Sequence, residues 1–173
     1  MGNMMSGGQG DELHVASFSI VRERPLQAQP VRLQVRDEAV PEPQVHLDTE
    51  ISFQHMRGFL NGRRFEMMSV ARDERLPLGK PVLWTFRNRG GMMSMMHPMH
   101  VHGVRFRVVE RRGATPSELR QGVMDAGFKD TVLVFPGEEV KVMFTPTSPG
   151  LFLYHCHNLE HEDDGMMRNY RVV

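Results

Sequence analysis

A series of short apolar runs, which begins near His46 and continues to the C-terminus, constrains the fold more than any other feature of the sequence. The runs are rich in β-branched and aromatic residues and end at Gly, Pro or Asn-Gly turn signals, which is typical of β-strands. The predicted strands are 51–53, 59–65 with a two-residue hairpin turn at Asn61-Gly62, 81–88, 104–111, 131–135, 140–144 and 151–157. A single helical turn is predicted at residues 117–123. About seven short strands predict an all-β fold, a Greek-key β-sandwich or barrel.

The N-terminal part of the chain follows a different and looser pattern. Residues 1–11 are Gly-rich without a period, as in a linker, and residues 13–21 alternate as a half-buried strand does. Prolines between Pro25 and Pro43 flank a second short strand at residues 31–35. We therefore divide the chain into a linker and edge segment, residues 1–43, and one core domain, residues 44–173.

Charge and hydropathy exclude several classes of partner. The 21 Lys and Arg balance the 21 Asp and Glu, so no net charge attracts the chain to nucleic acid or to an anionic membrane. No apolar run approaches the roughly 18 residues of a membrane span, and residues 1–10 lack the charged-then-apolar order of a signal peptide. We expect a protein made without export or a piece of a longer one. The single Cys156 excludes an internal disulfide and a four-thiolate zinc site.

Six of the nine histidines fall in two clusters. The first is His97-Pro-Met-His100-Val-His102, and the second is His155-Cys156-His157 followed by His161 and Met166. Successive side chains of a strand point to opposite faces. We therefore expect His155 and His157 on one face with Cys156 on the other. The same alternation places His100 and His102 together, and Pro98 favours an extended backbone at His97.

These side chains form two sets that suit copper. The first is the ligand set of a blue-copper electron-transfer site, made of His97, Cys156 and His161 with Met166 as a weak axial ligand. The second is an all-imidazole half-site, made of His100, His102, His155 and His157. Because the Cys156 backbone joins the two sets, an electron that reaches the first has a covalent route to the second.

Zinc is the alternative metal. A closed zinc site uses four ligands and no axial thioether, whereas this sequence offers eight ligands on two faces. The 15 methionines also favour copper, since thioethers are soft ligands, although methionine often fills irregular core gaps.

Five methionines crowd the segment around His97, namely Met92, Met93, Met95, Met96 and Met99. Thioethers bind Cu(I), so this loop is a candidate docking site for cuprous ions or a shield against oxidation. The alternative, which we favour, is a loop that packs against another domain. Met166 and Met167 are adjacent, so only one can face a metal, and the spacing from Cys156 favours Met166.

Two motifs resemble the C-terminal copper signatures of the multicopper oxidases, especially the bacterial laccase-like enzymes with three cupredoxin domains. They are HPMHVHG at residues 97–103 and HCHNLEHEDDGMM at residues 155–167, and the resemblance covers about residues 59–173. It implies a cupredoxin-like fold with copper as the cofactor. The implied type 1 copper ligands are His97, Cys156, His161 and Met166, the type 2 ligand is His100, and the type 3 ligands are His102, His155 and His157.

The resemblance also implies a catalytic role for Glu162. This residue directly follows His161 and matches an acid that helps to deliver protons to bound dioxygen in such enzymes. The alternative is a solvated loop carboxylate, like its neighbours Asp163 and Asp164.

One departure from the family matters for function. The family's trinuclear cluster needs eight histidines, four of them from two His-x-His motifs in an N-terminal domain that this chain does not offer. His14, His46 and His55 are isolated, and we interpret them as ordinary strand or loop histidines. The chain therefore supplies half of a trinuclear site. The expected partners are N-terminal cupredoxin domains or further copies of the chain, and residues 1–43 are an edge and linker segment from a preceding domain.

The function implied by the resemblance is that of a laccase-like multicopper oxidase. Such a domain takes single electrons from a small reducing substrate, such as a phenol or Cu(I), and passes them to a trinuclear cluster that reduces dioxygen to water. The isolated chain is expected to be inactive, and the family suggests a periplasmic or secreted location. Two alternatives stay open: a free-standing blue-copper electron-transfer protein, and an oligomeric copper-binding module without oxidase activity.

Overall fold

The computed structural model describes residues 16–19, 39–90, 95–113 and 124–173 of the protein. The chain divides into two compact units, residues 1–34 and 35–173. In the first unit only residues 16–19 are described, and their backbone forms neither helix nor strand. Among the described residues, every helix and strand lies in the second unit.

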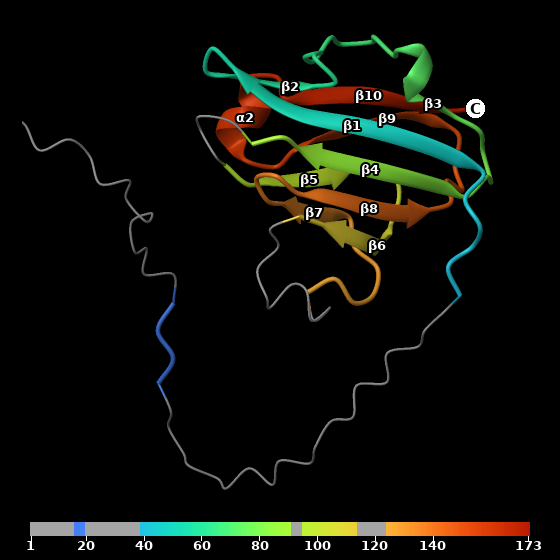
Figure 1. Ribbon diagram of the computed structural model, residues 1–173, viewed down its shortest axis with the longest axis horizontal. Helices are drawn as coiled ribbons and strands as arrows, with labels where there is room; N and C mark the ends of the chain where they lie inside the picture. Colours follow the sequence, from blue (N-terminus) through green and yellow to red (C-terminus); the bar gives the residue numbers. More distant parts are fainter. Residues whose placement is uncertain (1–15, 20–38, 91–94, 114–123) are drawn as a thin grey trace, which may run out of the picture. The chain divides into compact units, whose positions relative to one another are not determined.

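Two five-stranded sheets form the second unit (Figure 1). The first sheet has the order β2-β1-β4-β8-β6, with β1 at Val45–Gln54, β2 at Arg57–Leu60, β4 at Val82–Asn88, β6 at Arg107–Arg112 and β8 at Glu139–Phe144. The second has the order β3-β10-β9-β5-β7, with β3 at Arg75–Leu76, β5 at His97–Val101, β7 at Thr131–Val134, β9 at Gly150–Cys156 and β10 at Met167–Val172. Within the described residues, short helices lie at Arg72–Glu74 (η1) and Leu159–Asp163 (α2). The predicted all-β fold is confirmed.

The core lies between the sheets because burial alternates along the strands. In β1, Leu47, Thr49 and Ile51 are buried, whereas Asp48 is exposed and Glu50 is half-buried. This period of two is expected for a strand with one face on the core and one in water.

Trp84 of β4 packs at the centre of the core and contacts the opposite sheet. Its ring lies 4.8 Å from that of Tyr154 on β9 and 5.7 Å from that of Tyr170 on β10, both in edge-on contact. Trp84 Nε1 donates a hydrogen bond of 2.9 Å to Thr49 Oγ1, which satisfies the buried indole. These contacts fix β4 against β9, the strand that ends at Cys156.

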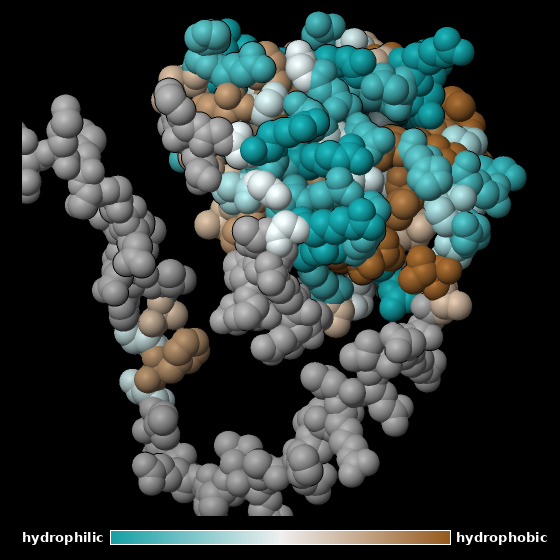
Figure 2. All heavy atoms as spheres, in the orientation of Figure 1, coloured by the Kyte–Doolittle hydropathy of each residue, from teal (hydrophilic) through white to brown (hydrophobic). Residues whose placement is uncertain are grey.

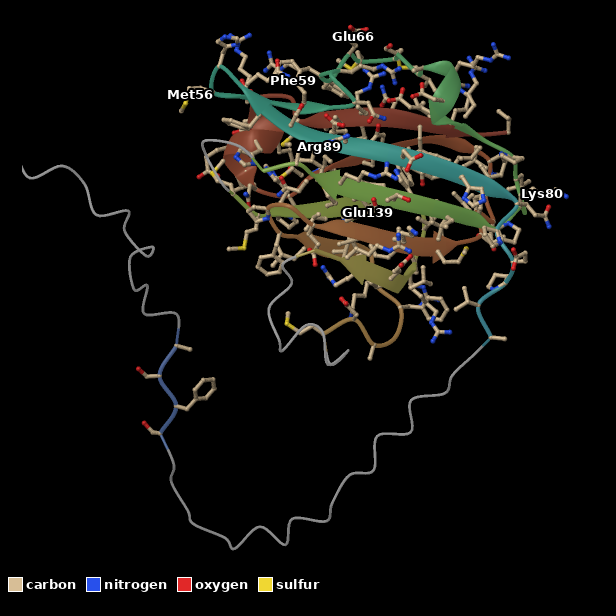
Figure 3. The ribbon with its side chains drawn as sticks, viewed as in Figure 1. Met56, Phe59, Glu66, Lys80, Arg89 and Glu139 are labelled. Carbon is tan, nitrogen blue, oxygen red and sulfur yellow. The ribbon has the colours of Figure 1, made fainter. Side chains whose placement is uncertain are left out.

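Hydrophilic side chains lie over the middle of the outer face of the first sheet (Figure 2), and charged residues among them form ion pairs. Arg87 on β4 bridges Asp48 on β1 at 2.6 Å and Glu139 on β8 at 2.7 Å. Lys141 on β8 contacts Glu110 on β6 at 2.6 Å. Figure 3 shows Glu139 and Arg89 on this face, which is therefore a solvated surface with paired charges.

The predicted turn at Asn61-Gly62 is present. Leu60 and Arg63 exchange backbone hydrogen bonds across it, and the two turn residues have φ values of 52° and 68°. The returning strand that we predicted to reach Phe65 is wrong, because only Arg63 bridges back to Leu60. The backbone N–H of Phe65 donates instead to the carbonyl oxygen of Gly165.

A second tight turn, at His55-Met56, was not predicted. It joins β1 to β2, with Gln54 paired to Arg57, and its two residues have φ values of 49° and 64°. Turns of this kind usually carry Asn or Gly, so the sequence gives no signal for it. The strand predicted at residues 51–53 is accordingly the end of the longer β1.

The other predicted strands are present with shifted ends. Strands β4, β7, β8 and β9 begin and end within one residue of the predictions, whereas β6 begins three residues later than predicted. Strand β9 ends at Cys156 and β5 ends at Val101, so His157 and His102 lie just beyond their strands. Strands β3 and β10 and helix α2 were not predicted.

Several predictions lie outside the described residues. They are the strand at 13–21 apart from 16–19, the strand at 31–35, the helical turn at 117–123, and the placement of His14, Met92 and Met93. The division between residues 43 and 44 stays a prediction.

Candidate metal centre

Strands β5 and β9 lie side by side and bring the two histidine clusters together. Their antiparallel register pairs Met99 with Cys156 and His100 with His155. Alternation along β9 then gives Cys156 and His155 different neighbours. Cys156 belongs to one group of side chains, the thiol cluster, and His155 belongs to another, the imidazole cluster.

The thiol cluster consists of His97, Cys156 and His161, all of them buried. Cys156 Sγ lies 3.5 Å from His97 Nδ1 and 3.3 Å from His161 Nδ1. Two ligand atoms bound to one metal at about 2.0 and 2.3 Å with a trigonal angle lie about 3.7 Å apart. The spacing of the thiol and the two imidazoles therefore fits a metal ion such as copper.

Helix α2 and the turn after it return the chain to Cys156. The backbone N–H of His161 donates to the carbonyl of Asn158, and that of Met166 donates to the carbonyl of His161. The N–H of Cys156 in turn donates to the carbonyl of Met166 at 3.1 Å. Met166 is completely buried in the core that includes Cys156, whereas Met167 is half-buried and paired with His155 in the sheet.

The imidazole cluster consists of His100, His102, His155 and His157. Ligand nitrogens of the first three lie within 4.8 Å of one another, and His102 Nε2 is 3.0 Å from His155 Nε2. The His157 ring lies at the edge of the cluster, 5.4 Å from the ring of His155. His102 and His157 are exposed, so the cluster opens to the surface.

Desolvation favours the neutral form of four of the imidazoles. It lowers the pKa of His97 to about 4, with a smaller effect from the nearby His161. Desolvation also lowers the pKa values of the buried His155 and His161 and, although its side chain is partly open to solvent, that of His102. A neutral imidazole has a free lone pair, so these side chains can bind a metal at neutral pH without first losing a proton.

Burial shifts the pKa of the Cys156 thiol in the opposite direction. Burial raises its pKa to about 11, so the thiol is protonated at neutral pH. A metal binds the thiolate, and its own charge favours loss of the thiol proton. Metal binding to the thiol cluster should therefore release a proton.

Glu162 lies against the imidazole cluster. Its Oε2 atom is 3.4 Å from His155 Nδ1, and the carboxylate remains partly exposed. The neighbouring acids differ, since Asp163 is exposed and Asp164 pairs with Arg64 at 2.8 Å. Glu162 is thus the one carboxylate of the three that reaches the cluster and solvent together.

Three residues that the sequence did not single out contact the clusters, and a fourth contacts Met166. The Phe53 ring lies 5.3 Å from that of His161, and the backbone of Gly58 lies against the Met166 side chain. His100 Nδ1 lies 2.9 Å from both the carbonyl oxygen of Asp130 and Thr131 Oγ1. These neighbours lie 30 or more residues away along the chain, so no local motif could have identified them.

The remaining candidate residues lie apart. His46 and His55 are exposed and join neither cluster, as expected for isolated histidines. Met99 is fully buried in the core, whereas Met96 is half exposed. The carbonyl of Met95 accepts a hydrogen bond from Asn88 Nδ2, which ties this loop to β4.

Comparisons with known proteins identify the family of the chain. The family model described as multicopper oxidase matches residues 27–173. The chain is 33% identical over 115 residues to a multicopper oxidase of Staphylococcus aureus, covering 66% of this chain and 24% of that protein. It is 38% identical over 128 residues to a laccase of Haloferax volcanii, covering 70% of this chain and 20% of that protein.

A solved structure gives the same result for the fold. The laccase from Pediococcus acidilactici superposes with a TM-score of 0.70 at 31% sequence identity, over 88% of this chain and 32% of that one. The fold is therefore cupredoxin-like. The chain spans about a fifth to a third of the proteins it resembles.

Proposed function

The chain belongs to the multicopper oxidase family, and from this premise we propose that it is the electron-accepting, C-terminal cupredoxin domain of a laccase-like enzyme. One observation carries the proposal. A single strand, β9, ends in a buried thiol with two buried imidazoles beside it, and the residue before that thiol belongs to an open cluster of imidazoles.

The residues of the thiol cluster fit a type 1 copper site. His97 and His161 would bind through Nδ1, Cys156 through its thiolate, and Met166 would be the axial ligand because it is the buried methionine of the pair. Bound copper would supply one-electron chemistry here and, in a completed trinuclear site, the reduction of dioxygen to water. The Cys156 backbone connects the thiol to His155 and His157 without a gap.

The imidazole cluster fits half of a trinuclear site. His100 would be the type 2 ligand, and His102, His155 and His157 would be type 3 ligands. Glu162, at 3.4 Å from His155 Nδ1 and partly exposed, is placed to pass protons from solvent toward this site. An N-terminal cupredoxin domain with two His-x-His motifs, or another copy of the chain, would supply the missing imidazoles.

The reducing substrate would be small and electron-rich, such as a phenol or Cu(I). A thioether axial ligand suits a low to middle reduction potential, which favours easily oxidised substrates. No helix in the described part of the chain is long and apolar enough to cross a membrane. We place the protein in the periplasm or outside the cell, as the family suggests.

Copper loading combined with an optical spectrum tests this function. The loaded protein should show an intense blue band from thiolate-to-Cu(II) charge transfer, and Cys156→Ser should lose the band together with one copper per chain. Ser52→Ala, at a half-buried position of β1 outside both clusters, is the matched control and should keep both. A blue band that survives in Cys156→Ser would refute the assignment. If the loaded protein holds one copper per chain and binds no more copper when a partner domain is added, the free-standing electron carrier would be favoured.

A further inference from the structure

Strand β2 packs directly on Met166 through Gly58. A Cβ atom at Gly58 would lie 2.7 Å from Met166 Sδ, 2.8 Å from Cγ and 2.9 Å from Cβ. Carbon atoms in contact normally lie about 3.5 to 4.0 Å apart. Any side chain at position 58 would therefore displace Met166 or lift β2 away from it.

The close approach of Met166 explains why residue 58 is a glycine, whereas its backbone conformation does not. The nine other glycines of the described residues have φ values between 68° and 153°, a region that favours glycine. Gly58 does not share this conformation and lies within a regular strand, where other residues fit. Its missing side chain thus serves to let β2 approach Met166.

Met166 has little freedom to move its backbone in response. Its N–H donates to the carbonyl of His161, and its carbonyl accepts from the N–H of Cys156. Both partners belong to the thiol cluster, and Met166 is completely buried. A side chain at position 58 would therefore act mainly on the Met166 thioether.

The register of the β1–β2 hairpin directs one contact at the thiol cluster and another at Met166. Gly58 pairs with Phe53, and the Phe53 ring lies 5.3 Å from the His161 ring. The tight turn at His55-Met56 sets this register with two left-handed residues, each of which costs about 1 kcal/mol or more. Figure 3 shows Met56 projecting from the tip of the hairpin, which lies at the same end of the sandwich as α2 (Figure 1).

We propose that Gly58 is a positioning residue for the axial thioether: by lacking a side chain it lets β2 hold Met166 Sδ in place and so sets the reduction potential of copper in the thiol cluster. The proposal rests on the proposed function only for the identity of the metal. The contact between Gly58 and Met166 is a property of the chain itself.

The variant Gly58→Ala tests the contact in the metal-free protein. The ¹³C methyl resonance of Met166, identified by its loss in Met166→Leu, should shift in Gly58→Ala. It should stay unchanged in Ser52→Ala, which alters the same hairpin at a position paired with Phe59. An unshifted Met166 methyl resonance in folded Gly58→Ala would overturn the proposal whatever metal the protein binds.

The copper-loaded protein tests the consequence. Gly58→Ala should stay blue and should change the ratio of oxidised to reduced protein in a fixed redox buffer about tenfold, which is 59 mV for one electron. The change should have the same direction as that of Met166→Leu and should be no larger, because leucine removes the axial sulfur entirely. In the Met166→Leu background, Gly58→Ala should have no further effect on the ratio. An equal effect in both backgrounds would overturn the proposal, whereas a colourless wild type would refute the proposed function instead.

If Gly58→Ala lowers the Tm too far for these measurements, Met166→Ala provides the second test. Truncating Met166 removes the two outer atoms that the new methyl group would meet. The loss of Tm caused by Gly58→Ala should therefore be smaller in the Met166→Ala background. An undiminished loss would show that the clash lies elsewhere and would overturn the proposal.

Discussion

Burial and metal binding make opposite demands on Cys156. The core holds the thiol protonated, with a pKa of about 11, while the neighbouring His97 is held neutral, with a pKa of about 4. Both residues are therefore uncharged at neutral pH, which lets the thiol cluster be buried before any metal is present. The cluster is thus compatible with a folded metal-free protein.

The pH dependence of stability follows from these two pKa values. Below the ordinary histidine value of 6.5, the unfolded chain binds a proton at His97 that the folded chain does not bind until about pH 4. The free energy of unfolding of metal-free protein should therefore fall as the pH drops from about 6.5 to 4, by roughly 3 kcal/mol from His97 alone. Above about pH 9 it should fall again, because the folded Cys156 keeps its proton to about pH 11.

Urea unfolding of the metal-free protein between pH 4.5 and 10.5 measures this profile. His97→Gln should have a weaker dependence on the acid side and an unchanged dependence on the alkaline side. A profile that is flat between pH 7 and 4.5 in the wild type would contradict the assigned burial of His97.

Redox measurements can test which of the adjacent Met166 and Met167 is the axial ligand. Met166→Leu should keep the copper, since an axial thioether is a long, weak bond, and should raise the reduction potential by about 60 mV or more, roughly tenfold in the redox ratio. Met167→Leu should leave the potential unchanged, because Met167 is only half-buried and pairs with His155 in the sheet. Redox titration of the blue band measures both, and a shift in Met167→Leu alone would reverse the assignment.

The sequence predicted the two clusters because their ligands follow local rules. Alternation along a strand separates Cys156 from its flanking histidines, and the structure has these residues in two distinct groups. The contacts of Phe53 and Gly58 could not be predicted, since they depend on the register between strands that are about 100 residues away from α2 and Met166. Sequence spacing describes one strand at a time, whereas these contacts join several.

At the scale of elements, the least predictable strand is β10, in which Arg168 and Asn169 are buried. Polar residues normally indicate an exposed position, but here each is satisfied by a distant partner. Arg168 makes two hydrogen bonds to the buried Glu74, at 2.8 and 2.7 Å, and Asn169 donates to the carbonyl of Glu66 at 3.0 Å. Tyr154 also donates to Glu74, so one carboxylate joins η1, β9 and β10.

The ion pair of Glu74 with Arg168 should therefore be important for stability. Glu74→Gln leaves the guanidinium of Arg168 buried without a counter-charge and should lower the free energy of unfolding by about 3 to 5 kcal/mol. Asp73→Asn, which removes the exposed ion pair with Arg63, is the control and should cost less than about 1 kcal/mol. Chemical denaturation measures both losses of unfolding free energy. Equal losses would mean that the buried pair stabilises the fold no more than the exposed pair does.

Within the whole molecule, the outer face of the first sheet differs from the surface around the imidazole cluster in whether its polar side chains pair with one another. The outer face of the first sheet pairs its charges internally, as with Arg87 between Asp48 and Glu139. The imidazole cluster instead places His102 and His157 at the surface, where both side chains are exposed. Because the family's trinuclear site needs four imidazoles more than this cluster supplies, we expect a partner to bind at this surface.

Activity should accordingly depend on assembly. The cluster offers four imidazoles where the family's trinuclear site uses eight, and in the described residues His46 and His55 lie outside it. Tight metal binding depends on a complete and preorganised set of ligands, so a monomer should consume dioxygen at no more than background rate. Adding an N-terminal cupredoxin domain with two His-x-His motifs, or self-association, should raise the rate. The raised rate should be lost in Cys156→Ser, which leaves the imidazole cluster intact but removes the thiolate. Light scattering for size, together with an oxygen electrode, measures this, and a stable monomer that reduces dioxygen to water unaided would overturn the half-site interpretation.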